Sequence, residues 1–155
     1  MRLLAPLFAG CCILLLTGCL SAKQYAAFPD QAKRVEDPAK GRIYVLRPSR
    51  INGLEFIPIS DGGKVIGQTT RWSYLCWERE PGETMITSSA EGVSQVALTV
   101  CPDNVYYIFQ HMRLGWLRSR TELELINQEK AGEMMKKCKP PKLEPQNAPP
   151  SAVGH

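Results

Sequence analysis

The chain has 155 residues, of which 44% are hydrophobic, and a formal net charge of +4. A chain of this size is long enough for one domain of roughly 100 residues between shorter terminal segments. Basic and acidic residues are interspersed along the sequence rather than gathered in blocks. This pattern, together with the small net charge, argues against nucleic acid as a partner.

The first residues have the pattern of an export signal. Arg2 is followed by an apolar run over residues 3–16 and then by small residues, which is the order of regions in a secretory signal. The run is shorter than the roughly 20 apolar residues that a membrane-spanning helix needs. An ordinary cleaved signal and an uncleaved anchor are the alternatives to the interpretation that follows.

The residues that close this run, Leu16-Thr17-Gly18-Cys19, resemble the lipobox of bacterial lipoproteins. The resemblance implies that residues 1–18 are removed and that Cys19 carries a diacylglyceryl group, usually with a further acyl chain on the new amino terminus. Two or three acyl chains anchor a protein stably to a membrane. In lipoproteins an aspartate after the cysteine favours the inner membrane, whereas this chain has Leu20, so we expect the periplasmic face of the outer membrane.

The segments on either side of the central part lack a regular pattern. Residues 19–40 contain Pro29, Pro38 and alternating charges without sustained periodicity, and we predict a lipidated tether. Residues 139–155 are rich in proline, which predicts a disordered or extended tail. The folded domain is therefore expected over residues 41–138.

The sequence of residues 41–138 has the pattern of a β domain. Short β-branched and aromatic runs alternate with turn residues, and Asp61-Gly62-Gly63 supplies the positive φ angles of a tight hairpin. Residues 127–137 instead carry helix formers after Asn127, a good N-cap. The fold class is all-β, and we predict a small antiparallel β-sandwich of about seven to eight strands with a short C-terminal helix. The predicted strands cover residues 42–47, 55–60, 64–69, 72–79, 83–89, 94–101, 105–112 and 121–126.

Three cysteines remain if Cys19 carries lipid: Cys76, Cys101 and Cys138. One disulfide and one free thiol is the simplest arrangement in an oxidising compartment, and spacing leaves all three pairings open. No cysteine pair has C-x-x-C spacing and the only histidines are His111 and His155, which argues against a zinc site. No phosphate-binding or dinucleotide-binding motif occurs either, so we expect neither a metal nor a cofactor.

A succession of strand ends and turns runs through the central part: Gly41 to Pro48, Asp61-Gly62-Gly63 with Ile66-Gly67, Ser73-Tyr74, Glu80-Pro81-Gly82 and Val105-Tyr106-Tyr107. This order resembles a family of small bacterial lipoproteins known as domain of unknown function 2846. The resemblance spans residues 41–138 and implies an envelope lipoprotein with a compact sandwich, somewhat like PEGA-type domains, and no established activity. It also implies a disulfide between Cys76 and Cys138.

Aromatic residues flanked by arginine in or near predicted loops are typical of recognition surfaces. The alternative is that Leu114, Trp116 and Leu117 simply cover one end of the sandwich. The candidate binding patch consists of Arg71, Trp72, Arg113, Trp116 and Arg118.

A catalytic site can be sketched from His111 as a base with Cys101 or Ser119 as a nucleophile. The chain lacks a glycine-flanked serine motif, so we interpret His111 as a surface residue and predict that the protein is not an enzyme. We expect a membrane-anchored, non-catalytic binding or structural module. The alternatives are an accessory subunit that recognises one envelope protein through the Trp116 loop, and an envelope hydrolase.

Overall fold

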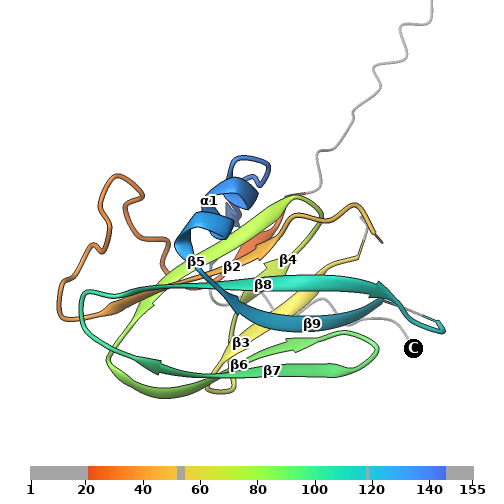
Figure 1. Ribbon diagram of the computed structural model, residues 1–155, viewed down its shortest axis with the longest axis horizontal. Coiled ribbons are helices and arrows are strands. Elements are labelled where there is room, and N and C mark those ends of the chain that lie inside the picture. The colour runs from red at the N-terminus through yellow and green to blue at the C-terminus, as the bar shows by residue number, and fades with distance from the viewer. Residues whose placement is uncertain (1–20, 52–54, 118, 146–155) are drawn as a thin grey trace, which may run out of the picture.

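The computed structural model describes residues 21–51, 55–117 and 119–145, which form two packed β-sheets with a helix on the outside (Figure 1). One sheet has six strands in the order β10-β1-β4-β3-β6-β7, and the other has four in the order β5-β2-β8-β9. The elements are β1 (Lys23–Gln24), β2 (Gly41–Arg47), β3 (Ile57–Asp61), β4 (Lys64–Thr69), β5 (Ser73–Arg79), β6 (Gly82–Ser89), β7 (Val93–Val100), β8 (Val105–Leu114), β9 (Ser119–Ile126), α1 (Gln128–Met135) and β10 (Lys142–Leu143).

The predicted small all-β sandwich is confirmed, and every strand predicted from the sequence occurs within about two residues of its expected bounds. The predicted C-terminal helix is also confirmed, as α1. Asn127 is its N-cap, because Asn127 Oδ1 accepts a hydrogen bond from the backbone N–H of Lys130 at 2.9 Å. Two strand pairs, β2–β8 and β1–β10, are parallel. The sequence predicted only antiparallel hairpins because turn residues reveal the pairing of consecutive strands and give no sign of long-range pairing.

The central strand β2 is buried along its whole length because both of its faces are covered. Ile43 and Val45 point into the core between the two sheets. Tyr44 and Leu46 alternate with them and belong to a second apolar cluster, which includes Ala131 of α1. The helix therefore covers the outer face of the four-stranded sheet.

Residues 21–40 are part of the folded body, so the predicted tether is wrong for them. β1 pairs antiparallel with β4, and Ala22 and Gln24 are fully buried. Gln24 Nε2 donates to the Cys76 carbonyl at 2.6 Å, and the Cys76 N–H donates to Gln24 Oε1 at 3.0 Å. A two-residue strand has no periodicity to detect, and its partners lie far away in the sequence.

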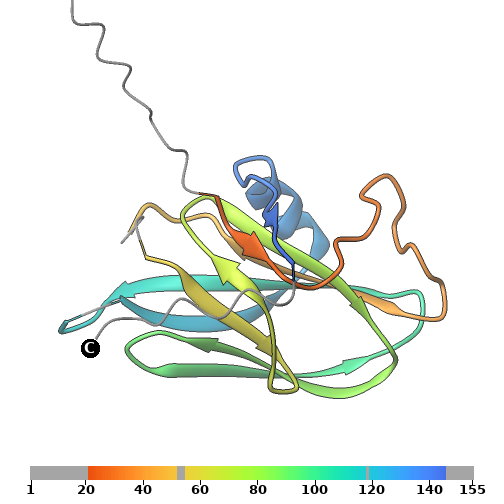
Figure 2. The same cartoon turned by 180° about the vertical axis from the view of Figure 1, so that it is seen from behind.

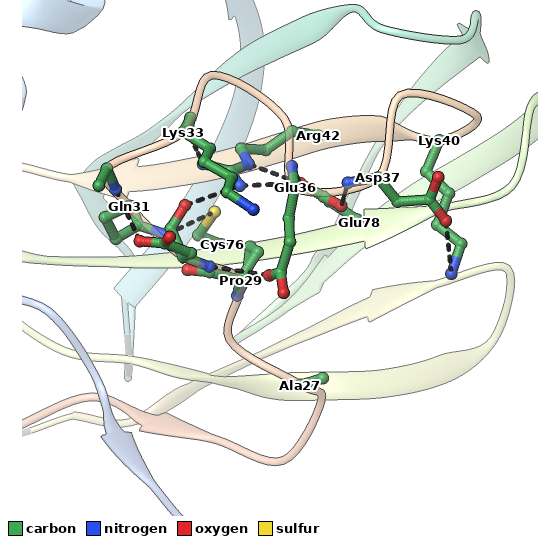
Figure 3. Close-up of polar contacts among 12 residues, drawn as sticks. Ala27, Pro29, Gln31, Lys33, Glu36, Asp37, Lys40, Arg42, Cys76 and Glu78 are labelled. Carbon is green, nitrogen blue, oxygen red and sulfur yellow. Dashed lines mark hydrogen bonds and ion pairs between the residues drawn. The ribbon is translucent and has the colours of Figure 1, made fainter.

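A buried ion pair fixes the loop between β1 and β2 (Figure 3). Arg42 Nε donates to Glu78 Oε1 at 2.9 Å, and the Arg42 side chain is completely buried. The two terminal nitrogens of Arg42 donate to the carbonyl oxygens of Lys33 and Asp30 at 2.7 and 3.0 Å. The Glu78 carboxylate accepts the backbone N–H groups of residues 36–37 at 2.6 and 3.1 Å.

The segment after α1 returns to the body, which corrects the predicted disordered tail for residues 139–144. β10 runs parallel to β1, and the two lie side by side in the view from behind (Figure 2). The Lys142 N–H donates to the Ala22 carbonyl at 2.7 Å, and the Glu144 N–H to the Gln24 carbonyl at 2.9 Å. Proline-rich composition concealed this short strand, and residues 146–155 lie outside the described part.

A chain of buried polar side chains joins the two sheets. Thr69 Oγ1 donates to Gln110 Oε1 at 2.6 Å, and Gln110 Nε2 donates to Ser88 Oγ at 2.8 Å. Ser88 Oγ in turn lies 2.9 Å from Thr121 Oγ1. Buried polar groups need such partners, so this chain fixes how the sheets sit on each other near the loops described next.

Candidate functional site

Four of the predicted binding residues, Arg71, Trp72, Arg113 and Trp116, lie at one end of the sandwich, which we call the tryptophan end. Arg47, the last residue of β2, pairs with Ser73, the first residue of β5. Since β8 runs parallel to β2, the β8–β9 turn points the same way as the loop between β2 and β3 (Figure 1). Ser21 lies at this end too, because β1 pairs with the last residues of β4.

The β8–β9 hairpin projects from the tryptophan end with exposed apolar side chains. β2 ends at Arg47 whereas β8 continues to Leu114, an extension of roughly 13 Å at about 3.3 Å per residue. Leu114, Trp116 and Leu117 are 77%, 90% and 86% exposed. They do not cover the end of the sandwich, so that alternative interpretation is wrong.

Trp72 occupies the turn between β4 and β5 in a left-handed backbone conformation, with φ of 51°. Its carbonyl accepts a hydrogen bond from the Lys139 N–H at 2.7 Å, and the Arg50 guanidinium carbon lies 5.9 Å from its ring centroid. A positive φ at a bulky residue is uncommon and persists only where surrounding contacts fix it. The backbone at Trp72 is therefore fixed by the fold.

A groove of about 560 Å³ lies between Trp72, Phe109 and helix α1. Lys130 Nζ lies 5.6 Å from the Phe109 ring centroid and 3.3 Å from Glu124 Oε1. Aromatic walls with a few charged groups are typical of sites that bind small ligands or peptide side chains. The full set of lining residues is Pro48, Trp72, Phe109, Asn127, Glu129, Lys130, Glu133, Met134 and Lys137.

The loop that follows β2 is fixed by the buried side chain of Arg47. Arg47 Nη1 donates to the carbonyl oxygens of Glu55 and Thr69 at 2.8 and 3.1 Å. Burial lowers the pKa of Arg47 to about 10, with a smaller opposing effect from the Glu55 carboxylate. This side chain remains charged at neutral pH and holds the loop against β4.

The structure brings the described residues of the predicted patch to one end but not into one continuous surface. In the four-stranded sheet β2 lies between β5 and β8, so Trp72 and the hairpin are separated by about 10 Å across the sheet. Arg113 forms an ion pair with Glu122, whose Oε2 lies 2.9 Å from Arg113 Nη2. Arg118, like Cys19, lies outside the described residues.

Sequence reasoning missed Phe109 and Lys130, which line the groove with Trp72. Phe109 was one of many alternating aromatic residues, and its outward face could not be known without the position of α1. Lys130 and Met134 are four residues apart on the helix, which is the spacing of neighbours on one helical face. That spacing was the one signal in the sequence that Lys130 and Met134 share a face of the helix.

The candidate catalytic residues do not come together. His111 Nε2 forms a hydrogen bond with Glu124 Oε2 at 2.5 Å. The Cys101 N–H donates to the hydroxyl of Tyr106, which is five residues before His111 on β8, or roughly 16 Å along an extended strand. Ser119 pairs with Leu114 at the tip of the hairpin. The proposed pairs of nucleophile and base are therefore not assembled.

The predicted disulfide between Cys76 and Cys138 is not formed in this structure, where both are free thiols. They belong to the same apolar cluster outside the four-stranded sheet, but their sulfur atoms have different partners. Gln31 Nε2 lies 3.6 Å from Cys76 Sγ, and the backbone N–H of Arg47 donates to the Cys138 thiol. Burial raises the pKa of each thiol to about 11.

Comparison with known proteins yields no relative. No protein-family model, curated protein or solved structure matches the chain. The resemblance to the lipoprotein family therefore stays a prediction. Within the described ranges no group of three or more His, Cys, Asp or Glu side chains could hold a metal ion, and α1 is too short to cross a membrane.

Proposed function

We propose that the protein is a lipoprotein of the bacterial cell envelope, anchored through acylated Cys19, that acts as a non-catalytic binding module. The observation that carries this proposal is the sequence Leu16-Thr17-Gly18-Cys19 directly after an apolar run. Ser21 lies at the surface of the folded body only two residues later. The binding role is supported by the groove between Trp72 and α1, whose aromatic walls are held by the surrounding loops.

Intact mass and membrane fractionation of the protein expressed in a bacterial host test the anchor. We expect the wild type to lose residues 1–18, to gain the mass of an acylated cysteine and to fractionate with membranes. Cys19→Ala should abolish the modification, whereas Cys101→Ala, a matched change of an exposed cysteine, should leave it intact. A wild-type protein that retains Met1 or stays unmodified in the cytosol would refute the proposal.

Leu20 supports the outer membrane as the destination, by the sorting preference of lipoproteins. Density-gradient separation of the two membranes in a double-membraned host tests this part of the proposal. The wild type is expected in the outer-membrane fraction and Leu20→Asp in the inner-membrane fraction, with unchanged acylation. Equal distribution of the two proteins would remove the argument from Leu20.

A further inference from the structure

Exposed cations lie at the tryptophan end, where the described part of the chain begins with Ser21. The Arg50 guanidinium lies over the Trp72 ring, and Arg71 directly precedes Trp72 in the sequence. The backbone of Lys139 is hydrogen-bonded to Trp72. The backbone of Lys142 is hydrogen-bonded to Ala22. None of these four cations forms an ion pair with any residue in the part of the chain that the structure describes.

Cations at the opposite end of the sandwich are arranged differently. Ion pairs there join Arg34 to Asp103, Lys40 to Asp37 and Glu80, and Arg79 to Asp61. At the tryptophan end three cations are also paired, Lys23 with Glu144, Arg113 with Glu122 and Arg120 with Glu91. Among the described residues, two cations at the opposite end, Lys33 and Lys64, form no ion pair, against the four cations named above at the tryptophan end. The tryptophan end therefore has more unpaired cations than the opposite end among the described residues, and the described part of the chain begins at this end, with Ser21.

The same end carries the most exposed apolar side chains of the described residues. Leu114, Trp116 and Leu117 project on the β8–β9 hairpin beyond the end of β2. Tryptophan is enriched where membranes meet water, and lysine and arginine are favoured beside anionic headgroups. The tryptophan end thus combines an apolar tip, cations and the attachment point of the anchor.

From these features we infer that the tryptophan end lies against the phospholipid surface to which the chain is anchored. This inference rests on the proposed acylation of Cys19. Two residues span at most about 7 Å, and Ala22 is buried beneath β10 and β4. The anchor therefore cannot hold the body far from the bilayer, and the surface nearest to Ser21 must face the lipid headgroups.

The orientation predicts which side chains touch lipid. Trp116 and its apolar neighbours enter the interface, and the four cations lie at the level of phosphate groups. Trp77, in contrast, is 2% exposed and hydrogen-bonded to Asp61 near the opposite end. The protein therefore carries an internal reference tryptophan that should not contact lipid.

The test uses purified full-length protein after processing in its host, reconstituted into vesicles of phosphatidylethanolamine and phosphatidylglycerol. Lipids brominated on their acyl chains quench nearby tryptophan fluorescence. We expect strong quenching in the wild type and much weaker quenching in Trp116→Phe. Absence of quenching in wild-type protein whose intact mass shows acylation would overturn the inference while leaving the anchor intact. An unacylated mass would instead refute the proposed function on which it rests.

Charge variants separate headgroup contact from general apolar insertion. In Arg71→Gln/Lys139→Gln the ratio of docked to undocked protein should fall about fivefold per removed charge, read from the quenching of Trp116. The matched control Lys33→Gln/Lys64→Gln, at the opposite end, should behave as wild type. Equal effects of both pairs would contradict the inference. Photocrosslinking from position 116 in cells to a stoichiometric protein, rather than to lipid, would also overturn it.

Discussion

The ion pair between Arg42 and Glu78 is expected to be the most sensitive single polar contact of the fold. Arg42→Met removes the partner of a carboxylate whose side chain is only 9% exposed. Methionine keeps an unbranched chain of similar length, so the change removes mainly charge and hydrogen bonds. We expect a loss of about 3–5 kcal/mol in the free energy of unfolding, as is typical when one member of a buried ion pair is removed.

The contacts of Arg42 explain this magnitude. Besides Glu78, Arg42 donates to the carbonyl oxygens of Asp30 and Lys33. Each of these acceptors loses a partner in the variant, and hydrogen bonds to a charged group are worth about 1.5–3 kcal/mol. Some of the loss will be recovered because the loop over residues 29–40 can open and admit water.

Urea denaturation followed by circular dichroism measures the effect, with Arg34→Met as the matched control. Arg34 also pairs with a carboxylate, that of Asp103, but the two side chains are 59% and 57% exposed. Surface pairs of this kind contribute about 0–1 kcal/mol. Equal stabilities of Arg42→Met and Arg34→Met would refute the reasoning that burial makes the first pair important.

The pH dependence of stability offers an independent check on the same pair. Burial alone would raise the pKa of Glu78, but the N–H groups of Glu36 and Asp37 and the guanidinium of Arg42 outweigh burial and lower this pKa. The carboxylate therefore contributes stability that is fully present above the pKa of an exposed glutamate, about 4.3, and that is lost as pH falls through the lower folded-state value. Glu78→Gln should be less stable at neutral pH, and the difference from wild type should narrow in acid; a constant difference would contradict this.

Two further predictions concern the cysteines and the docking of β1. Iodoacetamide at about pH 8 should modify exposed Cys101 in the native protein, whereas Cys76, fully buried and with a pKa near 11, should react only after unfolding; peptide mass mapping decides, and rapid native labelling of Cys76 would contradict its burial. Gly67→Ala should displace β1, because the added Cβ would lie 2.3 Å from the Lys23 carbonyl oxygen, whereas Gly92→Ala meets nothing within 4 Å. Trypsin cleavage after Lys23 should become faster in the first variant only, and equal rates would contradict the close contact.

The parts of the fold that follow local chemistry were predictable. Asp61, Gly62 and Gly63 indicated the β3–β4 hairpin, and both glycines have positive φ angles, of 55° and 83°. Alternation of apolar and polar residues gave the eight main strands, and Asn127 gave the start of α1. Each of these signals lies within a few residues of the structure that it specifies.

The parts that depend on long-range contacts were not predictable. β1 exists because Gln24 fits between two backbone groups of Cys76 and because Gly67 lets the strands approach closely. Nothing near Gln24 in the sequence indicates either partner. The candidate site was predicted only in part for the same reason. Trp72 and Trp116 were identified because arginines lie beside them in the sequence. Phe109 and Lys130 line the groove only because α1 packs on the sheet.

The pairing of β1 with β10 also has a consequence for the order of folding. β1 lies between β4 and β10, and its Ala22 and Gln24 carbonyls accept N–H groups from Lys142 and Glu144. Lys142 and Glu144 follow all the main strands of the two sheets in the sequence, so they are synthesised after them. β1 can therefore pair with β4 early in folding, but it gains its second neighbour only after the C-terminal segment has been synthesised.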